Sequence, residues 1–246
     1  MKTALVSFTL FSALTFQALG ASACTSITDG RLENYTGDIN RKYKISMTLV
    51  FGADAVNGEY FYHSQMKDIA LKGAISSGGV IALDELDASG KIVARFNGSV
   101  LDDCNTIKGN WQKAGSAEPI PFSVKLAGSH SGRVNHRYSQ AGADNDDIVH
   151  ANARKFWLGV KNGDKKAVAS VIAYPVRAQV AGKSRQFRSA KEFIASYDAI
   201  FTPDYRQAVI NSVPHNMSSS WRGIMLGEAG EVWLNEVGQV KALNNP

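Results

Sequence analysis

The feature that most constrains this chain is an alternation of apolar and polar side chains in its N-terminal half. Between residues 44 and 51, Ile45, Met47, Leu49 and Phe51 share one face of an extended segment. Such a pattern is typical of an antiparallel strand with one buried face. Similar short runs follow at 59–63, 69–73, 79–84, 91–97, 107–111 and 122–126. With turn residues between the runs and no helical pattern among them, residues 24–126 are predicted to form an all-β antiparallel barrel or sandwich.

The periodicity changes in the C-terminal half. From Asp147, the apolar residues Val149, Ala153, Phe156 and Val160 recur at helical spacing, and Gly163 follows. Further helices are predicted at 165–172, 189–201 and 202–209, and strands at 176–180, 221–226, 231–235 and 240–243. Residues 147–246 are therefore predicted to form an α+β domain, with a curved antiparallel sheet wrapped around helices.

The segment between the two halves, residues 127–146, is rich in Gly, Ser, Asn and Asp and is predicted to be a linker. Three histidines lie in or beside it, namely His130, His136 and His150. A metal site needs donors that regular structure brings to one face, and this segment offers none, so no metal site is predicted. His215 lies in a loop without an acid or nucleophile at interpretable spacing, and we expect it to be solvated.

Acidic residues at the end of this segment also have a structural explanation. Asp144, Asp146 and Asp147 lack the glycine and glutamate that a calcium-binding loop requires. We expect Asp146 and Asp147 to cap the helix that follows and to complement its positive end.

The N-terminus has the organisation of a secretory signal peptide over residues 1–23. Lys2 precedes an apolar run, and Ala21-Ser22-Ala23 fits a cleavage site. Cleavage would leave Cys24 first, and the sequence holds one other cysteine, Cys104. A disulfide between them is favoured over a lipid anchor on Cys24, because Ala21 stands where a lipobox has a large aliphatic residue.

Export places the protein in the periplasm, with an outer-membrane lipoprotein or a secreted protein as alternatives. Beyond the signal peptide no apolar run is long enough for a membrane-spanning helix. The net charge of +5 is spread along the chain, which argues against a nucleic-acid partner.

Two resemblances to known families follow from short motifs. Residues 91–100 and 107–111 resemble the small lipocalin-like barrels of bacterial envelope proteins, which implies either a cavity for an apolar ligand or an interior filled by side chains. We favour the filled interior. Residues 156–168, 174–177, 197–203 and 223–233 resemble the NTF2-like fold, shared with ketosteroid isomerase and SnoaL-type proteins. That resemblance implies a cone-shaped C-terminal domain with a pocket.

The sequence therefore predicts a non-catalytic exported protein that binds a small ligand or an envelope protein, with inhibitor- or immunity-like proteins as an analogy. The alternative is an isomerase or dehydratase with its pocket in the C-terminal cone. No catalytic residue and no cofactor is assigned. The candidate ligand-binding residues are aromatic or basic: Trp157, Tyr174, Tyr197, Trp221, Trp233 and Arg177.

Overall fold

The computed structural model describes residues 30–52, 55–76 and 78–245. The predicted signal peptide and Cys24 lie outside the described residues, and their assignments stay predictions. Cys104 is buried in the turn between two strands of the barrel.

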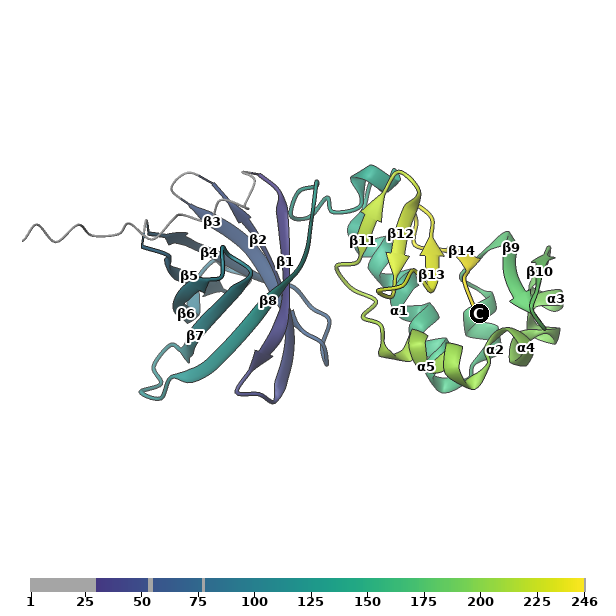
Figure 1. The fold of residues 1–246 in the computed structure, drawn as a ribbon, viewed down its shortest axis with the longest axis horizontal. Coiled ribbons are helices and arrows are strands. Elements are labelled where there is room, and N and C mark those ends of the chain that lie inside the picture. Colours follow the sequence, from purple (N-terminus) through teal and green to yellow (C-terminus); the bar gives the residue numbers. More distant parts are fainter. Residues whose placement is uncertain (1–29, 53–54, 77, 246) are drawn as a thin grey trace, which may run out of the picture.

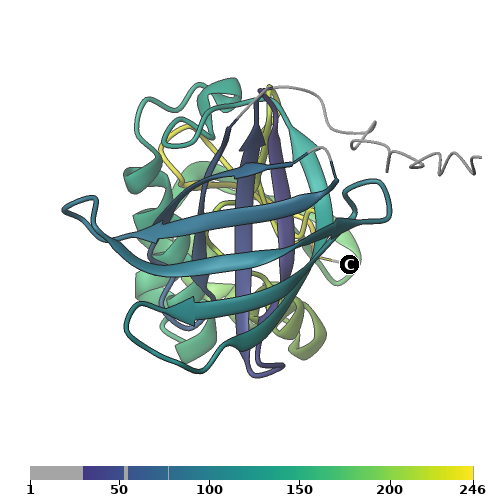
Figure 2. The same cartoon turned by 90° about the vertical axis from the view of Figure 1, so that its left-hand side faces the viewer.

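The N-terminal half is a closed eight-stranded barrel (Figures 1 and 2). Each strand pairs antiparallel with the next, and the last strand pairs with the first. The strands are β1 (Leu32–Ile39), β2 (Tyr43–Phe51), β3 (Val56–Tyr62), β4 (Ile69–Ile75), β5 (Val80–Leu86), β6 (Ile92–Leu101), β7 (Thr106–Lys113) and β8 (Ile120–His130). The predicted barrel is confirmed, and the sandwich alternative is wrong because β8 closes on β1.

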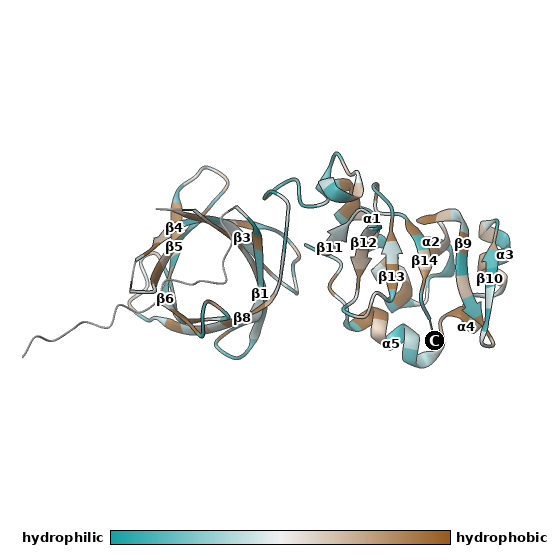
Figure 3. Cartoon of the chain, turned by 45° about the horizontal axis from the view of Figure 1, so that its top comes forward, coloured by the Kyte–Doolittle hydropathy of each residue, from teal (hydrophilic) through white to brown (hydrophobic). Residues whose placement is uncertain are grey.

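Side chains of the barrel's own strands pack its interior, which Figure 3 views nearly end-on. The rings of Tyr60 and Phe96 lie 5.1 Å apart, and those of Phe96 and Phe122 lie 5.0 Å apart, each pair edge to face. The alternating residues of β2, including Met47 and Leu49, point into the same core. An eight-stranded barrel is of a size that side chains can fill.

The C-terminal half is a six-stranded sheet with helices packed against it (Figure 1). The strand order is β10-β9-β14-β13-β12-β11, and β14 runs parallel to β9 while the other pairs are antiparallel. The strands are β9 (Ile172–Val180), β10 (Lys183–Phe187), β11 (Ser218–Ser220), β12 (Gly223–Leu226), β13 (Val232–Leu234) and β14 (Val240–Leu243). The helices are η1 (Ser139–Ala141), α1 (Asp146–Asn162), α2 (Lys165–Ala169), α3 (Ala190–Ala195), α4 (Tyr197–Ile200) and α5 (Pro203–Asn211).

The predicted NTF2-like cone is wrong. The sheet is mixed rather than antiparallel, because β14 lies beside β9 in parallel. Strands β11 to β14 have only three or four residues each, too few to curve around a pocket. A hydrophobic core fills the space between the sheet and the helices, and it includes Phe156, Val176, Ile200 and Val232. Within the described residues, no helix is both long and apolar enough to cross a membrane.

Candidate functional site: a polar cluster between the two halves

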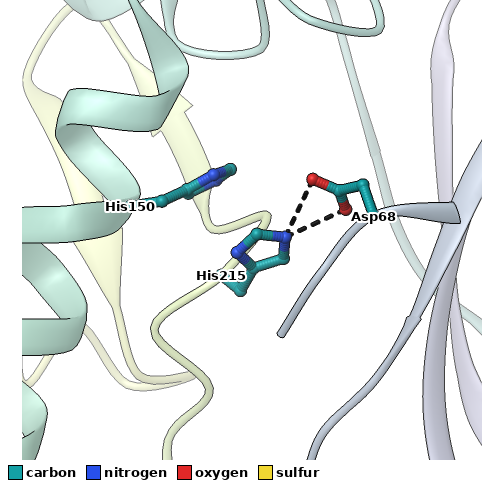
Figure 4. Close-up of side chains that lie close together, drawn as sticks. All are labelled: Asp68, His150 and His215. Atoms are coloured by element: carbon teal, nitrogen blue, oxygen red, sulfur yellow. Dashed lines mark hydrogen bonds and ion pairs between the residues drawn. The ribbon is translucent and has the colours of Figure 1, made fainter. Parts of the chain in front are cut away.

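Three potential metal ligands meet where the barrel contacts the C-terminal half (Figure 4). Asp68 comes from the turn between β3 and β4, His150 from α1, and His215 from the segment between α5 and β11. Each residue offers one donor atom, and these atoms all lie within 4.8 Å of one another. The cluster therefore unites three segments that are far apart in the sequence.

His215 connects the two halves directly. Its Nε2 lies 2.9 Å from Oδ1 and 3.0 Å from Oδ2 of Asp68. Its ring packs against Phe61 of β3 and lies 4.0 Å from the ring of His150, measured between centroids. The side chain is only 7% exposed, so the prediction of a solvated loop histidine is wrong. The reason is that this loop lies against the barrel rather than against solvent.

His150 is held by a buried tyrosine. The hydroxyl of Tyr138 accepts a hydrogen bond from the backbone N–H of Met217 at 2.9 Å and lies 2.8 Å from Nε2 of His150. Desolvation and the neighbouring His215 lower the pKa of His150 to about 3. The imidazole of His150 is therefore neutral at ordinary pH, and its Nε2 accepts a hydrogen bond from the backbone N–H of Asn216 at 3.3 Å.

A second pair of polar residues borders the cluster. The side-chain amide of Asn216 donates to Glu59 Oε1 at 3.0 Å and to Asp68 Oδ1 at 3.2 Å. Burial, reinforced by the nearby charge of Asp68, raises the pKa of Glu59 to about 7. The guanidinium of Arg137 opposes that shift from 3.9 Å away. Two carboxylates of the barrel, those of Glu59 and Asp68, thus lie within hydrogen-bond distance of the Asn216 amide from the C-terminal half.

A cavity of about 300 Å³ opens beside the cluster. Carboxylates, amides and imidazoles line it, and neither lysine nor arginine is among the lining residues: Glu59, Asp68, Asn135, His136, Asp144, Asn145, Asp146, Asp147, His150 and Asn216. In a chain with a net charge of +5, this concentration of acidic groups makes the cavity locally attractive to cations.

The helix cap at the edge of this cavity differs from the prediction. Asn145, not Asp146 or Asp147, caps α1, and its side chain accepts from the N–H groups of Asp147 and Ile148. Asp146 instead accepts from the backbone N–H groups of Arg137 and Tyr138. Its carboxylate therefore fixes the preceding loop.

The candidate residues predicted from the sequence lie outside this cluster. Trp157 donates from Nε1 to the backbone oxygen of Ile210, and Tyr174 donates to that of Ala169. Tyr197 is buried in the helical core. These three residues stabilise the fold and do not line a common pocket.

The other three predicted residues lie on or near the sheet. Trp221 is 80% exposed in the turn after β11, where the guanidinium of Arg222 lies 5.1 Å from its ring. Trp233 and Arg177 lie on β13 and β9, on the face of the sheet that points away from the helices. Trp233 and Arg177 share this face of the sheet with Ala242 between them, and only Arg177 lines a cavity there.

The junction residues Glu59, Asp68, Asn216 and Arg137 were missed because their contacts join distant parts of the chain. The amide of Asn216 meets Glu59 across 157 residues, and no local periodicity reports such a contact. In comparisons with known proteins, no family model matches this chain and no curated protein matches its sequence. The geometry of the junction therefore carries the functional argument.

Proposed function

We propose that this chain is an exported, non-catalytic binding protein of the bacterial cell envelope, and that it binds a divalent transition-metal ion at the junction. The observation that carries the proposal is the cluster of Asp68, His150 and His215, whose donor atoms lie within 4.8 Å of one another. The predicted signal peptide supports a location in the cell envelope, and the donor atoms at the junction support metal binding.

The donor set favours zinc and its neighbours in the first transition series. Imidazole nitrogen suits Zn²⁺, Cu²⁺ and Ni²⁺, and one carboxylate beside two imidazoles is a common three-ligand set. Metal–ligand bonds of about 2.0 Å place tetrahedral ligands about 3.3 Å apart. Donors that start within 4.8 Å can reach that spacing by small side-chain rotations. The adjoining cavity has room for a water molecule as a further ligand.

Ion binding at this position would stabilise the folded protein, because the three ligands come from both halves of the chain. An ion present at about one hundred times its dissociation constant would contribute about 2.7 kcal/mol. For a chain of this length, that corresponds to an increase in Tm of about 5–10 °C.

The test is isothermal titration of chelator-stripped mature protein with ZnCl₂, together with the visible absorption of the Co²⁺ complex. We expect one ion per chain, and at least tenfold weaker binding in His215→Ala and Asp68→Asn. His136→Ala is the matched control, because His136 lines the same cavity but is not one of the three clustered donors. Absence of binding to the wild type, or equal weakening by all three substitutions, would contradict the proposal.

A further inference from the structure

A row of side chains crosses the face of the C-terminal sheet that the helices leave uncovered. Met225, Trp233, Ala242, Arg177 and Gln186 lie directly opposite one another on five adjacent strands, β12, β13, β14, β9 and β10. Their neighbours along the strands point the other way, into the core, as Val232, Leu234, Val176 and Ala178 do.

A trough follows from the sizes of these side chains. Ala242, the smallest member of the row, lies between Trp233 and Arg177. A cavity of about 510 Å³ lies here, with Pro175 and Leu243 among its apolar lining residues. Its polar lining consists of cations, amides and a hydroxyl: Arg177, Lys241, Gln179, Gln186, Asn244, Asn245 and Ser184.

The charge of this trough is opposite to that of the junction cavity. Two cations line it, and no carboxylate is among its lining residues. Among the described residues, the guanidinium of Arg177 has no hydrogen-bond or ion-pair partner, so its donors are available to a ligand. Two hydrogen bonds between the side chain of Asn245 and the backbone of Gln179 fix the end of β9 beside it.

We propose that this trough binds a saccharide that carries a carboxylate. The fork of Arg177 pairs with the carboxylate in two parallel hydrogen bonds, while the ammonium of Lys241 donates to the backbone oxygen of Arg222. The amides of Gln179 and Gln186 match hydroxyl and acetamido groups, because an amide both donates and accepts, whereas the amide of Asn244 already donates to the backbone oxygen of Gly230 at 2.7 Å. Pro175 and Ala242 line the cavity and supply an apolar surface for the apolar face of a sugar ring, with Trp233 next to Ala242 in the row. The proposal is independent of the metal site, since the two share no residue.

The combination of groups favours a sugar acid over a simple anion. A phosphate or sulfate ion would use the guanidinium of Arg177 and leave the glutamine amides and the apolar lining without a partner. An apolar ligand would leave the guanidinium of Arg177 desolvated and unpaired, which is costly. A sugar acid uses all three kinds of group at once, and the cavity volume is within the range of small-molecule sites.

The test compares N-acetylmuramic acid with N-acetylglucosamine, two amino sugars that differ by one carboxylate-bearing ether. Each is titrated into ¹⁵N-labelled mature protein, and backbone amide shifts are followed. We expect the acidic sugar to shift residues of β9, β10 and β14 and to bind at least fivefold more tightly than the neutral one. Binding of inorganic phosphate as tight as that of the acidic sugar would overturn the assignment to a saccharide.

Two variants locate the interaction. Arg177→Gln should remove the preference for the acidic sugar. Arg185→Gln should leave it intact, because Arg185 lies on the same hairpin opposite Ala178 and packs over Phe187, away from the trough. Equal loss in both variants, or no preference in the wild type, would overturn the proposal.

The source of the sugar is distinguished by sedimentation with purified peptidoglycan. If the ligand is part of an insoluble polymer, the wild type should co-sediment with it and Arg177→Gln should remain in solution. If the ligand is a free sugar acid, the titration should succeed without co-sedimentation. Failure of the titration would refute the proposal whatever the sedimentation shows, and would leave the metal site untouched.

Discussion

Replacement of Arg137 by methionine should strongly destabilise the contact between the two halves. The side chain is 2% exposed and lies at the barrel wall. Its guanidinium donates to Asn34 Oδ1 of β1 at 2.8 Å and to the hydroxyl of Thr48 of β2. The carboxylate of Glu59 lies 3.9 Å away. Methionine fills a similar volume but removes both hydrogen bonds and leaves Glu59 without a counter-charge, while Asn34 Oδ1 keeps the hydrogen bond from the Thr48 hydroxyl at 3.0 Å.

The expected loss follows from the burial of both partners. Removal of one member of a buried ion pair costs about 3–5 kcal/mol, since the remaining charge stays desolvated. At about 4 kcal/mol, and about 2–4 °C per kcal/mol for a chain of this length, Tm should fall by about 8–16 °C. The loss should be smaller at pH 5 than at pH 8, because the pKa of Glu59, raised to about 7 by burial, leaves the carboxyl neutral at the lower pH.

Urea unfolding followed by tryptophan fluorescence measures this loss at both pH values. Arg133→Met is the matched control, since Arg133 lies in the same segment but is exposed, and it should change the free energy of unfolding little. A loss below about 1 kcal/mol at pH 8 for Arg137→Met, or a loss that does not depend on pH, would refute the reasoning.

Three further predictions test other parts of the structure. Burial raises the pKa of Glu59 to about 7, so the folded state resists ionisation of this carboxyl and the free energy of unfolding of the wild type should fall by about 3 kcal/mol as the pH rises from 4.5 to 7. Unfolding of Glu59→Gln should lack that pH dependence. A β-carbon at Gly73 would lie 1.8 Å from the backbone oxygen of Ala82, so Gly73→Ala should destabilise the barrel by about 2 kcal/mol, measured by urea unfolding. Intact-mass measurement of the envelope-derived protein should find the mature chain two hydrogens lighter than its reduced form, as a Cys24–Cys104 disulfide requires, whereas a large mass increment would indicate a lipid on Cys24.

The barrel was predictable because the sequence patterns that specify its strands and turns are local. Ile45, Met47 and Leu49 alternate along β2, and the structure buries all three in the barrel core. Each strand pairs with its neighbours in sequence, so short turns largely determine the pairing. Only the choice between closed barrel and open sandwich required a contact between the ends, which β1 and β8 make.

The C-terminal sheet was not predictable in the same way. Helix α1 ends at Asn162, as the periodicity and Gly163 indicated. The pairing of Ala242 with Arg177 in parallel, however, joins strands separated by β10, three helices and strands β11 to β13, and no turn chemistry specifies it. The prediction based on the NTF2-like resemblance also omitted β10 and placed the strands in the wrong order in the sheet.

The candidate site between the two halves could not be predicted from the sequence either, because its residues are distant from one another in the chain. His150 lies on a predicted helix, but the sequence does not reveal that Asp68, in a barrel turn, lies beside His215. The relevant distances depend on how the two halves dock, and docking follows from side-chain complementarity rather than from periodicity. A buried histidine in a loop is therefore a signal that only the assembled structure supplies.

The connection between the halves explains why the junction is a suitable place for a ligand site. Residues 127–146 have the composition of an open linker, yet Arg137 and Tyr138 within them are buried. Asp146 accepts from the backbone of both residues, and Ser219 donates to the backbone oxygen of Arg137. Composition indicates that a segment is polar, but it does not indicate whether water or protein satisfies its polar groups. Here protein does, so the segment holds the barrel turn and α1 at a defined separation, as a three-ligand ion site with donors from both halves requires.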